Sequence, residues 1–194
     1  MSDPALTQLA DWGNFYVIVG SAAGGLTGLM FVVITLAAQV QTIGNENGLS
    51  AFVSPTVVHF CSVLLIAAIV ASPAHRPAAL GLAIGACGAI GIAYIAWAMD
   101  KGRRQHEYEP VHSDWLWYGC MPAAAYASFI AAGIMVFAGH ANGGLYILAV
   151  GTLWLLFTGI HNAWDSALWI AISTGRRKSQ PEDTGAPGTD TLSD

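Results

Sequence analysis

The feature that most constrains the fold of this chain is a series of five long apolar segments separated by short polar ones. A transmembrane helix needs about 20 consecutive, mostly apolar residues, and every segment reaches that length. Charged residues make up only 10% of the chain, against roughly 25% in soluble domains, so lipid must cover much of the surface. We therefore predict an all-α, polytopic membrane helix bundle within residues 1–174. Its five spans are predicted at residues 14–40, 51–72, 77–99, 115–138 and 144–172.

The basic residues predict how the bundle is oriented. Of the seven, three lie between the third and fourth spans, three follow the fifth span, and Arg76 lies between the second and third. With five spans, both clusters of three fall on the same side. Basic residues collect on the cytoplasmic side, which places the N-terminus outside and the C-terminus in the cytoplasm. Residues 175–194 are poor in apolar residues and rich in Pro, Gly and Asp, which predicts a disordered cytoplasmic tail.

Three glycines at spacing four, Gly20, Gly24 and Gly28, mark one face of the first span. Small residues at this spacing let two membrane helices approach closely. The third span carries a less extended version at Gly81 and Gly85. Packing inside one bundle and an interface between copies of the chain both explain the pattern. The sequence leaves these two interpretations open.

The fifth span carries a polar stripe that includes His161, Asn162 and Asp165. At about 100° per residue these side chains share one face of the helix. An ionisable residue inside a membrane span is costly and marks a functional site by default. The span is overlong, however, so Asp165 can also lie at the cytoplasmic interface, where it would be an ordinary polar residue. The site hypothesis depends on the depth of this helix in the bilayer.

The second span carries a shorter polar stripe centred on His59. His59 can meet Asp165 or His161, depending on how deep the fifth span sits. A His–Asp pair there would be a titratable site, because histidine titrates near neutral pH. The alternative is a core histidine that hydrogen-bonds to a neighbouring backbone or hydroxyl group.

The loop between the third and fourth spans contains His106, Glu109 and His112 at spacing three. These residue types can bind a divalent metal, but Pro110 interrupts the helix that would align them. A solvated loop is the simpler interpretation. We predict no cofactor. The net charge of −5 argues against a nucleic-acid partner, because such proteins carry a basic surface.

Residues 13–39 read GNFYVIVGSAAGGLTGLMFVVITLAAQ. This segment resembles the opening of a loose group of uncharacterised small multi-pass proteins of the bacterial inner membrane. The resemblance implies that location and carries no information on activity.

These observations support three functional hypotheses. The leading one is a small channel or transporter that works as a homo-oligomer, because five short spans are few for a complete substrate path. The second is an accessory or sensor subunit that binds another membrane protein through its helices. The third is an intramembrane redox or metal-binding protein. Because the sequence contains no familiar catalytic motif, we do not expect an enzyme.

Overall fold

A computed structural model describes residues 4–40, 46–72, 76–104 and 115–178. The described chain is entirely helical, as the apolar segments predict. The helices are α1 (Pro4–Val40), α2 (Glu46–Ala71), α3 (Pro77–Arg104), a π-helical turn η1 (Leu116–Cys120) that leads into α5 (Met121–Phe137), and α6 (Ala141–Lys178).

Four of these stretches are long and apolar enough to cross a membrane, one fewer than the five spans predicted. They are Trp12–Thr35, Pro77–Lys101, Leu116–Phe137 and Ala141–Leu168. The exception is α2, whose described apolar part covers only Pro55–Ala71. Together these helices indicate a membrane protein.

The helix boundaries extend beyond the apolar segments from which they were predicted. Helix α1 begins at Pro4 and α2 at Glu46, and Pro55 lies inside α2. Helix α6 continues to Lys178 and so includes the first four residues of the predicted tail. Polar helix ends can stay hydrogen-bonded outside the lipid, which explains why hydropathy alone misplaces the boundaries.

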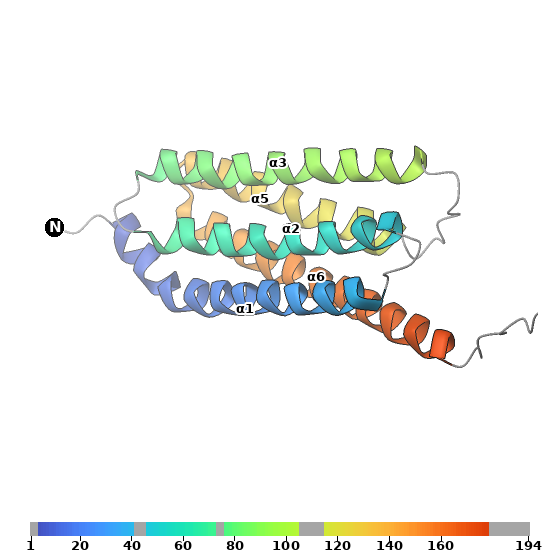
Figure 1. Ribbon diagram of the computed structural model, residues 1–194. Helices are drawn as coiled ribbons and strands as arrows, with labels where there is room; N and C mark the ends of the chain where they lie inside the picture. The colour runs from blue at the N-terminus through green and yellow to red at the C-terminus, as the bar shows by residue number, and fades with distance from the viewer. Residues whose placement is uncertain (1–3, 41–45, 73–75, 105–114, 179–194) are drawn as a thin grey trace, which may run out of the picture.

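The helices form one bundle of elongated, nearly antiparallel rods (Figure 1). Helices α3 and α5 pair along one side, α1 lies on the opposite side, and α2 and α6 lie between them. Helix α6 crosses the bundle obliquely and extends past the end of α1.

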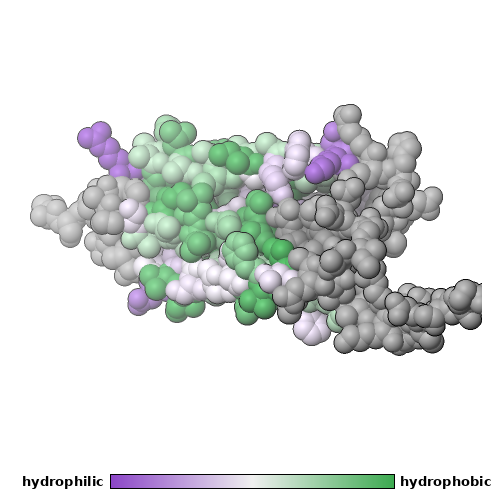
Figure 2. All heavy atoms as spheres, viewed as in Figure 1, coloured by the Kyte–Doolittle hydropathy of each residue, from purple (hydrophilic) through white to green (hydrophobic). Residues whose placement is uncertain are grey.

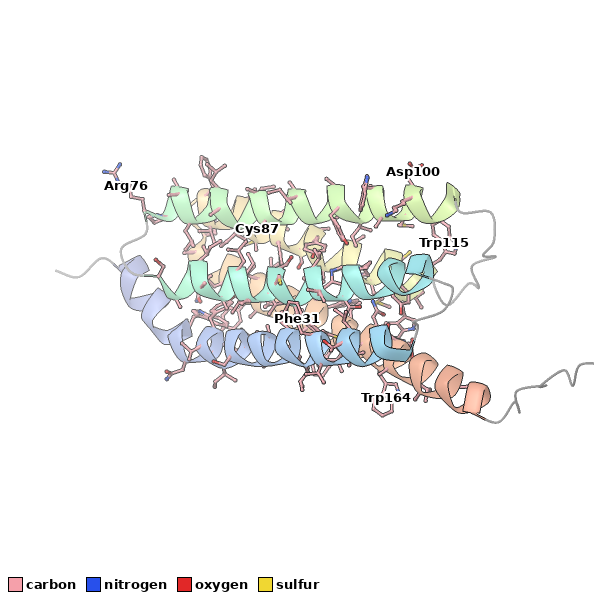
Figure 3. The ribbon with its side chains drawn as sticks, in the orientation of Figure 1. Phe31, Arg76, Cys87, Asp100, Trp115 and Trp164 are labelled. Atoms are coloured by element: carbon pink, nitrogen blue, oxygen red, sulfur yellow. The ribbon has the colours of Figure 1, made fainter. Side chains whose placement is uncertain are left out.

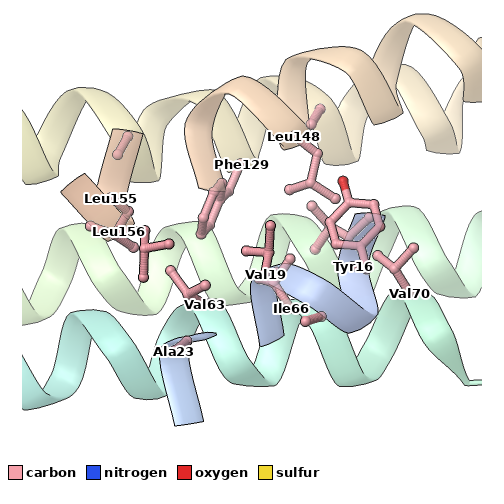
Figure 4. Packing of buried hydrophobic residues seen from close by; sticks show 14 of the residues in the cluster. Tyr16, Val19, Ala23, Val63, Ile66, Val70, Phe129, Leu148, Leu155 and Leu156 are labelled. Carbon is pink, nitrogen blue, oxygen red and sulfur yellow. The ribbon is translucent and has the colours of Figure 1, made fainter. Parts of the chain in front are cut away.

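The core is filled by side chains from all five long helices. Tyr16, Val63, Phe129 and Leu148 come from four of these helices and meet in the cluster shown in Figure 4. The outer surface is also apolar, and exposed residues include Ile18, Leu82 and Phe157. On the face in Figure 2, hydrophobic residues occupy the middle and hydrophilic residues lie toward the two ends. A surface of this kind fits a lipid surrounding.

The closest helix approach occurs between α3 and α5. A Cβ atom added to Gly81 would lie 2.6 Å from the Gly133 carbonyl oxygen, and one added to Gly133 would lie 2.6 Å from the Gly81 carbonyl oxygen. The two backbones therefore touch where neither residue has a side chain. The sequence pattern drew attention to the first span more than to this pair.

Candidate functional site

The central polar contact of the bundle joins His59 of α2 to Tyr126 of α5, and both side chains are fully buried. The His59 Nδ1 atom lies 3.1 Å from the Tyr126 hydroxyl oxygen. That oxygen lies 3.0 Å from the Ser62 hydroxyl oxygen, one turn along α2. The sequence stripe predicted that His59 faces the interior, but the partner Tyr126 was missed because it is an isolated tyrosine in an apolar span.

Counting hydrogens gives this contact a direction. The Ser62 hydroxyl donates to the Val58 carbonyl oxygen at 2.8 Å, which uses its single hydrogen. With that hydrogen placed on the Val58 bond, the Tyr126 hydroxyl donates to Ser62, and His59 Nδ1 carries the hydrogen donated to Tyr126. The network thus assigns His59 the tautomer that is protonated on Nδ1.

This tautomer leaves His59 Nε2 as a hydrogen-bond acceptor. Within the described part of the chain, the atom is buried and has no hydrogen-bond partner. Burying a polar group without a partner costs about 1–3 kcal/mol. His59 therefore differs from a satisfied core histidine, in which both ring nitrogens are hydrogen-bonded.

Asn162 of α6 is the second buried group with an unused acceptor. Its Nδ2 group donates to the Trp117 carbonyl oxygen at 3.3 Å, and its Oδ1 atom is buried with no partner among the described residues. The amide cannot be turned around, because Oδ1 would then face the carbonyl oxygen of Trp117.

Proline explains why the Trp117 carbonyl is available to Asn162. In the π-helical turn, the Met121 N–H bonds to the Leu116 carbonyl five residues earlier. The corresponding donor for Trp117 would be residue 122, which is proline and has no N–H. Asn162 supplies the missing hydrogen bond and so holds α6 against η1.

His161 and Asp165 lie one turn apart near the outside of α6. The His161 Nε2 atom is 3.7 Å from Asp165 Oδ2, and the two side chains are 33% and 47% exposed. The His161 ring also contacts the Trp117 ring, with centroids 3.7 Å apart. The partner of Asp165 in this structure is thus His161 on its own helix, whereas His59 bonds to Tyr126.

Three buried hydroxyl groups of α6 are satisfied locally. Thr152, Thr158 and Ser166 each donate to the carbonyl oxygen four residues earlier on the same helix. This arrangement lets a membrane helix bury hydroxyls without a partner on another helix. These hydroxyl groups therefore differ from His59 Nε2 and Asn162 Oδ1, which have no hydrogen-bond partner among the described residues.

The three predicted packing glycines differ in their surroundings. A Cβ atom on Gly20 would lie 2.8 Å from the Ala67 Cβ of α2, and one on Gly24 would lie 4.0 Å from Leu64. A Cβ atom on Gly28 would meet nothing within 4 Å. Helix α1 therefore approaches α2 most closely at Gly20.

The predicted metal ligands His106, Glu109 and His112 lie outside the described residues. In the part of the chain that the structure covers, no three His, Cys, Asp or Glu side chains are placed to hold a metal ion.

These features define an all-helical membrane bundle with a buried His59–Tyr126 pair, a half-buried Ser62 bonded to it, and a buried Asn162. No protein-family model matches the sequence, and neither a curated protein nor a solved structure matches it.

Proposed function

We propose that this protein is a small channel or transporter of the bacterial inner membrane that works as a homo-oligomer. The main support is the pair of unused acceptors, His59 Nε2 and Asn162 Oδ1, which are buried on α2 and α6, together with the partly exposed His161–Asp165 pair on α6. Unpaired polar groups inside a membrane bundle are costly, so they mark candidate functional positions. The four residues provide polar groups from the surface of α6 to the interior.

The proposed topology has five spans, with the N-terminus outside. Helix α2 has 26 residues, or about 39 Å at 1.5 Å per residue, which is long enough to cross a hydrocarbon core of about 30 Å. Helices α3 and α6 end at the same end of the bundle, which gathers the two basic clusters (Figure 1). Arg76 lies at the opposite end from Asp100 (Figure 3).

Asp165 belongs at the cytoplasmic mouth in this topology. It lies 24 residues after Ala141, the first residue of α6, or about 36 Å along the helix. That distance exceeds the thickness of the hydrocarbon core, about 30 Å. Asp165 is then interfacial, which was the alternative to an intramembrane carboxylate. We propose it as an entrance group at that interface, with His59 as the deeper group.

An outward face of α1 supports assembly of several copies. Ser21, Gly25 and Gly28 are exposed at spacings of four and three. Cβ atoms added to Gly25 and Gly28 would meet nothing within 4 Å. Small residues at such spacings let a helix of another copy approach closely.

Ion flux through purified protein in liposomes tests the proposal. We expect the native chain to conduct under a proton or a potassium gradient. We expect Asp165→Asn to reduce flux at least tenfold, because the entrance loses its charge but keeps its shape. Asp100→Asn, at the exposed end of α3, is the matched control and should conduct like the native chain. Native protein that is folded but passes neither ion would contradict simple proton or potassium conduction.

The alternative is an accessory subunit that binds another membrane protein. The outward small-residue face of α1 also fits a helix of a different protein. Purification from native membranes distinguishes the two, because an accessory subunit should retain a stoichiometric partner and a homo-oligomer should contain one type of chain.

A further inference from the structure

The two unused buried atoms lie on facing helices. Helices α2 and α6 pack together, and the Phe60 ring lies against Gly159, where an added Cβ atom would be 2.6 Å from it. His59 precedes Phe60, and Asn162 follows Gly159 by three residues. Both residues therefore lie within one helical turn of the same contact between α2 and α6.

Each of the two residues is held in place by its other polar atom. His59 is fixed by its bond to Tyr126, and Asn162 by its bond to the Trp117 carbonyl. A histidine whose second nitrogen donates to a fixed partner is held in one tautomer and one ring orientation. The two unused atoms are thus set in position before any ligand arrives.

Both unused atoms are acceptors, which defines the chemistry of the ligand. His59 Nε2 offers a lone pair, and Asn162 Oδ1 is a carbonyl oxygen. Either atom can accept a hydrogen bond or coordinate a metal cation. No three His, Cys, Asp or Glu side chains among the described residues are placed to hold a metal ion, so we infer a hydrogen-bond donor. Because both residues are fully buried, the donor must also be small.

We propose that His59 Nε2 and Asn162 Oδ1 form an internal binding site for a small hydrogen-bond donor of the water or ammonia/ammonium class. The inference goes beyond the proposed transport function, because it assigns an occupant to the interior site and does not name the ion that is transported. Its test reads occupancy of the site and needs no flux, so the failure of one proposal is distinguishable from the failure of the other.

Nitrogen-15 NMR of histidine-labelled protein in lipid bilayers tests the site directly. The His59 signals are identified as those lost in His59→Gln. We expect Nδ1 to carry a hydrogen and Nε2 to give the signal of an unprotonated nitrogen that accepts a hydrogen bond. Spectra are recorded without additions, with ammonium chloride, and with an equal concentration of potassium chloride. Potassium is the control because it is a monovalent cation that donates no hydrogen bond.

Each outcome decides the proposal. A hydrogen-bonded Nε2 whose signal is unchanged by both salts identifies water as the occupant. A shift of the signal with ammonium but not with potassium identifies ammonia or ammonium.

Asn162→Leu should move the Nε2 signal toward that of a free nitrogen. If ammonium binds, the substitution should weaken binding about five- to tenfold, the effect of one lost hydrogen bond. Ser128→Ala, which removes a hydroxyl bonded to its own helix, should change neither. A free Nε2 in all three media, or a hydrogen on Nε2, would overturn the proposal.

Discussion

Replacing Gly133 with alanine is expected to destabilise the bundle more than any other single methyl group added to α5. The new Cβ atom would lie 2.6 Å from the Gly81 carbonyl oxygen and from the Gly85 nitrogen. Both are backbone atoms, so no side-chain rotation relieves the clash, and α3 and α5 must move apart. We expect a loss near the upper end of the about 1–3 kcal/mol that overpacking costs. Unfolding in bilayer-like micelles, followed by circular dichroism during titration with a denaturing detergent, measures it.

Gly85→Ala is the matched control for this prediction. It adds the same methyl group to the same helix pair, but the new Cβ atom would meet nothing within 4 Å. Alanine also favours a helix over glycine by up to about 1 kcal/mol, so this variant should be as stable as the native chain or more stable. Equal stability of Gly133→Ala and Gly85→Ala would show that α3 and α5 do not touch as described.

Tyr126→Phe is the second substitution for which we expect a large effect. It removes only the hydroxyl oxygen, but it leaves the His59 Nδ1–H without its acceptor and Ser62 without its donor. An unsatisfied buried polar group costs about 1–3 kcal/mol, and we expect the free energy of unfolding to fall by that amount. The same detergent titration measures the change.

A double-mutant cycle separates the hydrogen bond from general damage to the core. Removing both partners of a buried hydrogen bond is often nearly neutral, so His59→Leu with Tyr126→Phe should cost less than the two single changes added together. We expect a coupling of about 1 kcal/mol or more. Additive effects would mean that the two side chains do not bond, and the deduced tautomer of His59 would lose its basis.

The sequence predicted the parts of the fold that depend on hydropathy. Long apolar runs with few charges require helices in lipid, because every backbone polar group must be bonded within its own segment. The same reasoning failed at the start of α2, which begins at Glu46, five residues before the predicted span. Residues 46–50 read ENGLS and are mostly polar, so no hydrophobic pattern marked them as helical.

The polar site was only partly predictable, because a stripe identifies one helix face and not its neighbour. His59 and Asn162 were chosen from periodicity, and both are fully buried. Tyr126 gave no periodic signal, and its partnership with His59 depends on how α2 and α5 are placed. The sequence did contain one signal for the role of Asn162. Pro122 has no N–H to donate to the Trp117 carbonyl, so that carbonyl needs another donor, such as the Asn162 side chain.

The glycine contacts show the same limit. Spacing four drew attention to Gly20, Gly24 and Gly28, yet the tightest approach joins Gly81 to Gly133, which belongs to no such pattern on α5. Whether a glycine is needed depends on the backbone opposite it, and a single sequence does not contain that information.

The membrane topology tests the account most directly, because the proposed entrance and interior depend on which end of the bundle faces the cytoplasm. Single cysteines replace Arg76, His140 or Lys101 in a chain whose three native cysteines are substituted. A membrane-impermeant thiol reagent is then applied to intact cells. We expect it to label Arg76→Cys and His140→Cys, and to label Lys101→Cys only after the membrane is opened. Labelling of Lys101→Cys in intact cells, or of Arg76→Cys and His140→Cys from opposite sides, would contradict five spans with the N-terminus outside.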